Sequence, residues 1–309
     1  RGASAQQHPA AGDRQRRLGS VEHAFGFLPA PQAAHGEDNR FAYRFGDAAA
    51  AGTAVAIDGE WAVIGVPGDN RSLILNYVAD GPTPGWQEHE WLTPPPGVAE
   101  FGQAIDLNGH ELLIGAPGGA EAVGAWILED DTFPDGTTQV LWTSYGFLGS
   151  PLPPGSRWGH AVTIDSGTAF VGSPEYNGGS GRIHSLYLLD GMLEPGADLT
   201  DEIPWTNGRI GWDIMCRNGQ LYVTAPSYGL NEASGIIWVL RNLQQDDGSF
   251  AWSLNNYLTP PANVLSSQFG FSVFTNGSRV GIGAPSAGGT GAVYLYDCSV
   301  SDDDFPTFP

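Results

Sequence analysis

The sequence predicts an all-β protein built from five similar sheets, and three observations support this fold class. A segment of 17 residues occurs five times along the 309-residue chain. Each copy has strand-forming residues on both sides of a turn, and most copies are followed by two more apolar runs. Self-similarity with a period of this size is typical of repeat architectures. We therefore interpret the chain as one repeat structure.

The two clearest copies of the segment are FGQAIDLNGHELLIGAP from Phe101 and FGFSVFTNGSRVGIGAP from Phe269. The other three copies begin at Ala51, Trp158 and Ile210. The proline that ends each copy lies at the same distance from its first residue, so no copy contains an insertion. The five prolines are Pro67, Pro117, Pro174, Pro226 and Pro285, which gives periods of 50, 57, 52 and 59 residues.

Each segment reads as a β-hairpin. With the first residue of a copy counted as position zero, positions four and thirteen are Val or Ile in every copy. Between them lies a turn with glycine as its second residue, such as Asp58-Gly59, Asn108-Gly109 or Asn276-Gly277. Apolar alternation on both sides of an Asn-Gly or Asp-Gly pair is the strongest short-range signal for a hairpin. The acids Asp58 and Asp165 are expected to bond to their own turns.

A third apolar run follows the hairpin, as in AWILED from Ala125 and AVYLYD from Ala292, and an aromatic fourth run follows in most units, as in YGFLGSP from Tyr145. Each unit is thus a four-stranded antiparallel sheet. Sheets of this kind repeated around an axis form a β-propeller, in which each sheet is called a blade. We predict five blades.

The fifth unit lacks its fourth strand, because AVYLYD runs directly into a polar tail. Residues 22–31 contain FGFLPAP, which matches the fourth runs of other units, so this N-terminal strand is expected to complete the last blade and close the ring. The predicted domains are an extended basic arm at residues 1–19, one five-bladed propeller at residues 20–298 and an acidic C-terminal tail at residues 299–309.

The Phe-Gly and Gly-Ala-Pro pairs at the ends of the copies resemble those of FG-GAP repeats, the units of the integrin α-subunit propeller. The resemblance covers nearly the whole chain, and it implies a propeller of an extracellular or cell-surface protein with a role in adhesion. Integrin propellers have seven blades and calcium loops, whereas this chain has five copies and no loop with three alternating oxygen ligands. We therefore expect no metal and no cofactor.

Composition restricts the partners. The net charge of −21 argues against binding nucleic acid, and no apolar run approaches the roughly 20 residues that cross a membrane. No histidine pair has the spacing of a zinc site, and no nucleotide-binding or hydrolase motif is present. On these grounds we expect that the chain is not an enzyme.

The loops predict two different faces. Acidic residues gather between the third and fourth strands, as in EDDTFPDG from Glu129, whereas the opposite loops are rich in proline, glycine and aromatic residues. An aromatic surface can stack on a sugar or a protein partner. The candidate binding residues on this face are Trp158, Tyr176, Trp212 and Tyr228.

Three further sets of residues are candidates for modification or assembly. Asn70 and Asn276 begin sequons that could carry glycans. Cys216 is expected to be a small core residue, and a disulfide with Cys298 is an open alternative. Arg14, Arg16 and Arg17 lie in the N-terminal arm, whose charge favours docking on the acidic face of the same molecule or of a neighbour, a contact that 1 M salt should dissociate.

Three function classes follow from these observations. The leading hypothesis is a non-catalytic extracellular propeller that binds other proteins or copies of itself, as a subunit of a surface filament or adhesion structure. The first alternative is a glycan-binding lectin. The second is a five-bladed glycosidase, which needs two or three inward carboxylates in the central channel. Repeat position three offers one lone acid, Asp213, where the other copies have Ala or Ser, so this class ranks last.

Overall fold

The computed structural model describes residues 49–80, 84–132, 138–203, 208–229, 234–244, 250–261 and 266–297. The chain divides into two compact units, residues 1–46 and 47–309, and all described residues belong to the second. The predicted arm, the strand at residues 22–31 and the tail at residues 299–309 lie outside the described residues. Ring closure by the N-terminal strand therefore remains a prediction.

The all-β propeller of five antiparallel blades is confirmed. Blade one contains β1 (Val55–Asp58), β2 (Trp61–Val66), β3 (Arg71–Val78) and β4 (Gly85–Leu92). Blade two contains β6 (Ala104–Asn108), β7 (Glu111–Ala116), β9 (Ala122–Thr132) and β10 (Thr138–Gly149). Blade three contains β11 (Ala161–Asp165), β12 (Thr168–Gly172), β13 (Ile183–Leu189) and β14 (Met192–Asp198). Blade four contains β15 (Ile214–Arg217), β16 (Gln220–Ala225), β17 (Ile236–Gln244) and β18 (Phe250–Leu258).

Blade five has three strands among the described residues, β19 (Ser272–Thr275), β20 (Arg279–Ala284) and β21 (Ala292–Asp297). A small ribbon of β5 (Val98–Ala99) and β8 (Gly118–Gly119) flanks blade two. The helical turns are η1 (Pro67–Asp69), α1 (Tyr176–Gly179), η2 (Thr200–Glu202) and η3 (Ala287–Gly289). Among the described residues, no helix is long and apolar enough to span a membrane.

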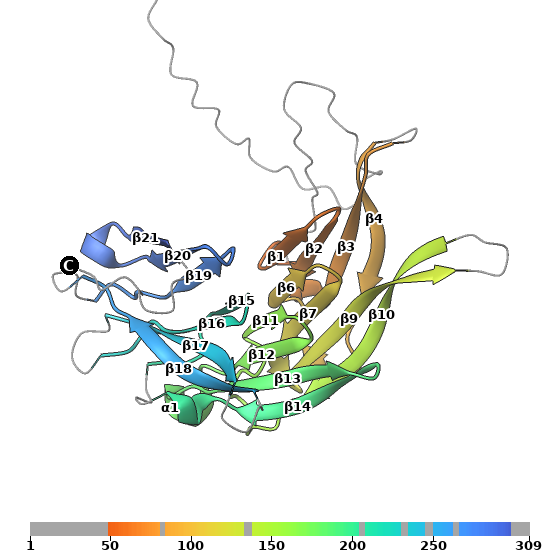
Figure 1. Cartoon of the computed structure of the whole chain (residues 1–309). Helices are drawn as coiled ribbons and strands as arrows, with labels where there is room; N and C mark the ends of the chain where they lie inside the picture. Colours follow the sequence, from red (N-terminus) through yellow and green to blue (C-terminus); the bar gives the residue numbers. More distant parts are fainter. Residues whose placement is uncertain are drawn as a thin grey trace, which may run out of the picture. The chain divides into compact units, whose positions relative to one another are not determined.

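The first strands of the blades, β1, β6, β11, β15 and β19, lie side by side at the centre, and the other strands extend outward (Figure 1). The predicted hairpins join the first two strands of every blade. In blade four, both Asn218 and Gly219 have positive φ, 55° and 71°. Two consecutive residues with positive φ make the primed turn that matches strand twist.

The core consists of four clusters, and each lies between two consecutive blades. The cluster between blades two and three, for example, contains Leu113 and Val123 from blade two with Trp158 and Ile164 from blade three. The other three clusters join blades one and two, three and four, and four and five. Since a sheet is stable when its apolar face is covered, neighbouring blades stabilise each other.

The repeated glycines allow the blades to approach closely. A Cβ atom added to Gly115 at position fourteen would lie 2.1 Å from the carbonyl oxygen of Gly159, the Phe-Gly-type glycine of the next blade. Gly172 and Gly211 repeat this relation at 2.1 Å. A side chain does not fit between these backbones, which explains the glycines at both ends of the segment where blades two, three and four meet. In blade four, position fourteen is Thr224, which faces Gly270 of blade five.

Candidate functional site

A buried polar network joins the first strands of blades two, three and four. The carboxylate of Asp106 on β6 accepts hydrogen bonds from Thr163 Oγ1 at 2.7 Å and from Arg217 Nη2 at 2.7 Å. Burial opposes the charge of Arg217, but the hydrogen bond and negative charge of Asp106 outweigh it and raise the pKa of the guanidinium. The opposite charges of Asp106 and Arg217 neutralise each other and are hydrogen-bonded, as buried charges require. Together with Thr163, they link the first strands of three blades.

The turns at the inner ends of the hairpins also bond from blade to blade. Asp58 Oδ2 accepts the amide of Gly109 at 2.5 Å, and Asp165 Oδ2 accepts the amide of Gly219 at 3.0 Å. The expectation that Asp58 and Asp165 bond to their own turns was therefore wrong. Each carboxylate accepts a hydrogen bond from a backbone amide in the turn of the following blade. These acids hold the blades in register.

Asp213, the lone acid at position three, links blades four and five. Its two carboxylate oxygens accept the amides of Ile214 at 2.9 Å and Val273 at 2.7 Å. Burial raises the pKa of Asp213 to about 6, which the two amide hydrogen bonds partly oppose. A carboxylate with both oxygens occupied by backbone amides serves mainly to position β19 against blade four.

A row of rings lines the loop face near the start of the inner strands. His160, Trp212 and Phe271 occupy position two of blades three, four and five, and their ring centroids are separated by 4.8 Å and 5.5 Å. His160 Nδ1 lies 3.0 Å from the carbonyl oxygen of Trp212. Burial, with the nearby charge of Arg157, lowers the pKa of His160, so its ring is neutral at pH 7.

A pocket of about 310 Å3 lies beside this row, between the loop that precedes Trp158 and the loop that follows Pro174. Its lining includes Pro153, Ser156, Glu175 and Tyr176. The guanidinium of Arg182 lies 4.5 Å from the centre of the Tyr176 ring, and Glu175 pairs with Arg209 at 3.2 Å. One aromatic ring with a carboxylate and a hydroxyl suits a polar ligand.

A buried acid that sequence reasoning missed shapes this pocket. Glu121 is 6% exposed, and its carboxylate accepts the amides of Gly155 at 2.7 Å, Arg157 at 3.1 Å and Trp158 at 3.0 Å. A carboxylate bound by three amides fixes the loop of the pocket wall. The sequence offered little signal for this role, because Glu121 is an isolated acid in a glycine-rich loop.

The four predicted aromatic residues have different surroundings. Trp158 is 1% exposed and packs in the core between blades two and three, so in this structure it cannot stack on a ligand. Tyr228 is half-buried against Trp238, with ring centroids 5.8 Å apart. Tyr176 lines the pocket and Trp212 belongs to the ring row. Tyr176, Trp212 and Tyr228 are each partly exposed, whereas Trp158 is not.

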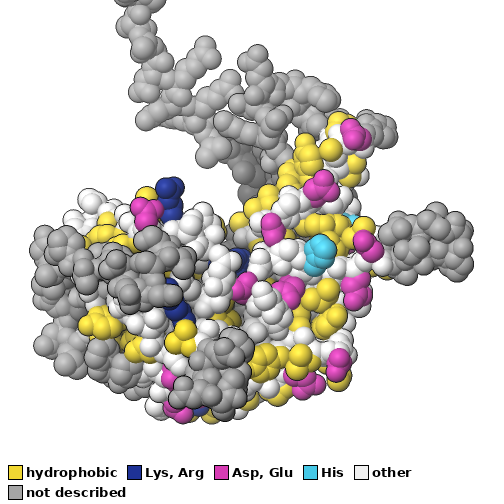
Figure 2. All heavy atoms as spheres, in the orientation of Figure 1, with side chains coloured by type: hydrophobic (Ala, Val, Ile, Leu, Met, Phe, Trp, Pro, Cys, Tyr) yellow, Lys and Arg dark blue, Asp and Glu magenta, His cyan; other side chains and the backbone are white. Residues whose placement is uncertain are grey.

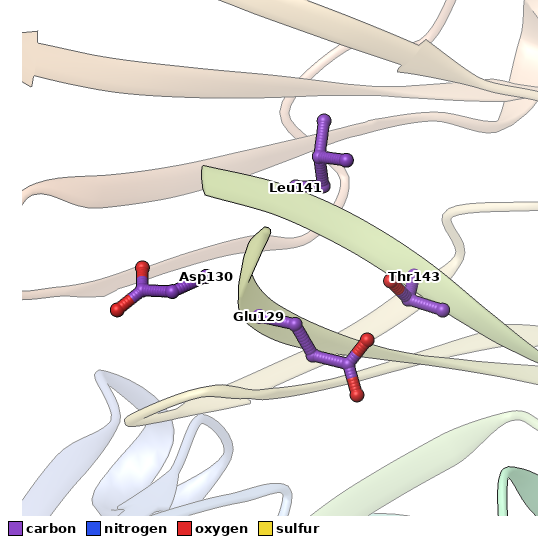
Figure 3. Close-up of a pocket in the computed structure, with 4 residues that line it drawn as sticks. All are labelled: Glu129, Asp130, Leu141 and Thr143. Atoms are coloured by element: carbon purple, nitrogen blue, oxygen red, sulfur yellow. The ribbon is translucent and has the colours of Figure 1, made fainter. Parts of the chain in front are cut away.

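A second pocket, of about 440 Å3, lies on the β9–β10 hairpin. It is lined by Glu129, Asp130, Leu141 and Thr143, and the two carboxylates extend in different directions (Figure 3). Figure 2 shows acidic side chains spread over blades one and two rather than gathered in one place. No group of three metal-binding side chains occurs in the described ranges.

The predicted modification sites also have definite surroundings. Asn70 donates from Nδ2 to the carbonyl of Val98 at 2.9 Å and accepts the amide of Phe101 at 3.0 Å, so a glycan on this nitrogen would break a contact between blades one and two. Asn276 is exposed in the turn of blade five. Cys216 is a free, fully buried cysteine. Its proposed partner Cys298, and Arg14, Arg16 and Arg17, lie outside the described residues.

No protein-family model and no curated protein sequence matches the chain. The solved structures that are similar to it at low identity include the following three. The β-propeller domain of Cps50 (Swd1) from Myceliophteria thermophila is 14% identical, with a TM-score of 0.44 over 79% of this chain and 69% of that chain. The computationally designed Ika4 protein is 16% identical, with a TM-score of 0.35 over 68% of this chain and 94% of that chain.

The third similar structure is an exo-1,5-α-L-arabinanase from a bovine ruminal metagenomic library, which is 12% identical with a TM-score of 0.38 over 82% of this chain and 94% of that chain. This finding contradicts the expectation that the chain is not an enzyme, because the propellers that it resembles include a glycosidase. The absence of nucleotide-binding and hydrolase motifs therefore does not exclude catalysis.

Proposed function

We propose that this protein is an FG-GAP-like propeller that binds other proteins or copies of itself, as an assembly module of an extracellular or cell-surface structure. The observation that carries the proposal is a set of apolar side chains exposed on the described parts of blades one and five, where Val55 is 67% and Leu295 80% exposed. Large exposed apolar patches are typical of protein interaction sites.

Charge supports a role for the N-terminal arm in this association. Six arginines of the described propeller each form an ion pair with a carboxylate: Arg71, Arg157, Arg182, Arg209, Arg217 and Arg279. Because each of these charges is already paired, they do little to offset the remaining acidic residues. The surface is thus strongly acidic overall, and a basic arm is attracted to it. Arg14, Arg16 and Arg17 are the proposed contact residues.

Sedimentation velocity of the full chain over a range of concentrations tests the proposal. We expect association that rises with concentration and that weakens at 1 M salt, where the Debye length falls to roughly 3 Å. Replacing Arg14, Arg16 and Arg17 with Glu should weaken association in the same way, whereas replacing Arg40 and Arg44 with Glu is the matched control. A chain that stays monomeric at all concentrations, and that captures no partner from its native extracellular material, would contradict the proposal.

Glycan binding is the second candidate, and the pocket at Tyr176 favours it. The pocket combines the Tyr176 ring with the carboxylate of Glu175 and the hydroxyl of Ser156, the kind of surface on which a sugar can stack and form hydrogen bonds. A glycan array should show binding that Tyr176→Ala abolishes and that Tyr187→Ala, a substitution on the outer part of blade three, preserves. The same polysaccharides should be assayed for hydrolysis, because the fold is compatible with catalysis.

A further inference from the structure

The pocket at Tyr176 and the Trp212 ring lie on two loops that are joined through their backbones. The pocket loop follows β12 of blade three, and the loop with Trp212 leads into β15 of blade four. The amide of Arg209 donates to the carbonyl oxygen of Gly179 at 2.9 Å, which ties the second loop to the first. Because the link is a backbone hydrogen bond, the pocket and the ring keep a fixed position relative to each other.

The side chain of Arg209 connects the two surfaces directly. Its guanidinium lies 3.2 Å from the carboxylate of Glu175, which lines the pocket, and 5.3 Å from the centre of the Trp212 ring. The side chains of Arg209 and Glu175 are 42% and 32% exposed. Since an arginine has five donors and a carboxylate has several acceptor positions, an exposed pair of this kind can also bond to the hydroxyls of a ligand. The pocket, the ion pair and the Trp212 ring therefore form one continuous surface.

The two aromatic rings of this surface are partly exposed and are held in place by their neighbours. The guanidinium of Arg182 lies 4.5 Å from the centre of the Tyr176 ring. Trp212 lies between the rings of His160 and Phe271, with centroids 4.8 Å and 5.5 Å away. Side chains whose orientation is already fixed lose little conformational freedom when a ligand stacks on them. Tyr176 and Trp212 are therefore suitable as two platforms of one site.

The charges around this surface favour an uncharged ligand. The net charge of −21 repels anions from the molecule as a whole. Each of the three arginines beside the surface forms an ion pair with a carboxylate: Arg157 with Glu100, Arg182 with Asp198, and Arg209 with Glu175. These arginines are thus already neutralised. A sugar without acidic groups offers an apolar face for the rings and hydroxyls for the polar side chains between them.

We propose that the pocket and Trp212 form one extended site for a linear, uncharged oligosaccharide. One sugar unit stacks on Tyr176, a later unit stacks on Trp212, and hydroxyls between them bond to the pair of Arg209 and Glu175. This inference names the ligand class and a second platform for the glycan-binding candidate, and it rests on that candidate. A chain that reaches both platforms binds more tightly than a fragment that reaches only one, because its second contact is intramolecular.

Calorimetric titration with cello-, xylo- and manno-oligosaccharides of two lengths, disaccharides and hexasaccharides, tests the extended site. We expect the hexasaccharide of at least one series to bind about tenfold more tightly than its disaccharide. Trp212→Leu keeps an apolar side chain between His160 and Phe271 but removes the platform, so it should abolish this gain and leave disaccharide binding unchanged. Tyr176→Ala should weaken both ligands. Tyr187→Ala, on the outer part of blade three, is the control and should change neither.

Other outcomes separate this inference from the glycan-binding candidate. If both lengths bind equally, or if Trp212→Leu weakens both by the same factor, the pocket acts alone, so the candidate survives and the extended site does not. Oligogalacturonates of the same lengths, which are anionic, should bind at least tenfold more weakly, and tighter binding would show that the ligand class is wrong. If no oligosaccharide binds, the glycan-binding candidate and this inference both fail, whereas assembly measured by sedimentation is a separate result.

Discussion

The interface between blades four and five and the outer face of blade five use the same repeat positions in opposite circumstances. Ile237 and Val239 lie against Phe269 and Val273, whereas the corresponding Val293 and Leu295 face solvent. Both faces are apolar, because each repeat encodes the same half-interface. The comparison shows that the burial of a repeat position depends on whether another blade packs against it, and not on the residue type alone.

The largest difference in stability between the centre of the propeller and the outer face of blade five should appear when one partner of a charge pair is removed from each. Asp106→Ala leaves the buried guanidinium of Arg217 without its carboxylate, which should lower the free energy of unfolding by about 3–5 kcal/mol. Asp297→Ala removes a comparable pair with Arg279 on the exposed flank of blade five and should cost under about 1 kcal/mol. Urea denaturation of both variants measures the contrast, and equal losses would refute it.

Truncation of matched apolar residues tests burial directly. Ile237→Ala removes buried methyl groups from the interface of blades four and five and should cost about 2–5 kcal/mol. Val293→Ala, at the corresponding position of blade five, should be nearly neutral in dilute solution, where copies do not associate. A large loss of stability in Val293→Ala at low concentration would mean that something within the same chain covers this face.

The pH dependence of stability should report Asp213. Burial raises the pKa of this carboxyl to about 6 in the folded state, so its contribution to stability is complete below its unfolded pKa, near 3.8, and is lost as the pH rises through 6. Between these two pH limits, the contribution of Asp213 to the free energy of unfolding changes by at most about 3 kcal/mol. Thermal unfolding of the protein between pH 4 and 7 should therefore show a steeper decline than that of Asp213→Asn. Parallel declines would show that Asp213 does not titrate in this range.

The smallest difference in stability is expected between alanine substitutions at two glycines that have the same backbone conformation. Gly211 and Gly52 have φ angles of 77° and 79°, so alanine at either position meets a left-handed strain of roughly 1–2 kcal/mol. Gly211→Ala also forces a side chain between two blades, which should add about 1–3 kcal/mol. The difference in urea midpoint between the two variants isolates the packing of blades.

The sequence by itself determined the blade. Val or Ile at positions four and thirteen, with Asn218-Gly219 and its counterparts between them, was sufficient to predict each hairpin, because strand alternation and turn chemistry are local. The burial of Cys216 was also predictable, since it occupies an apolar position of the repeat. These features depend on residues close together along the chain.

Only the tertiary structure decided what each loop and inner residue does. Trp158 looked like a binding platform but lies in the core, and Asp106 finds Arg217, 111 residues away, in another blade. Likewise, Val55 and Val273 occupy the same repeat position, yet one is exposed and the other buried. No local pattern distinguishes such residues, because their burial and charge pairing depend on which blade lies beside them, and that neighbour is set by the closure and ends of the propeller.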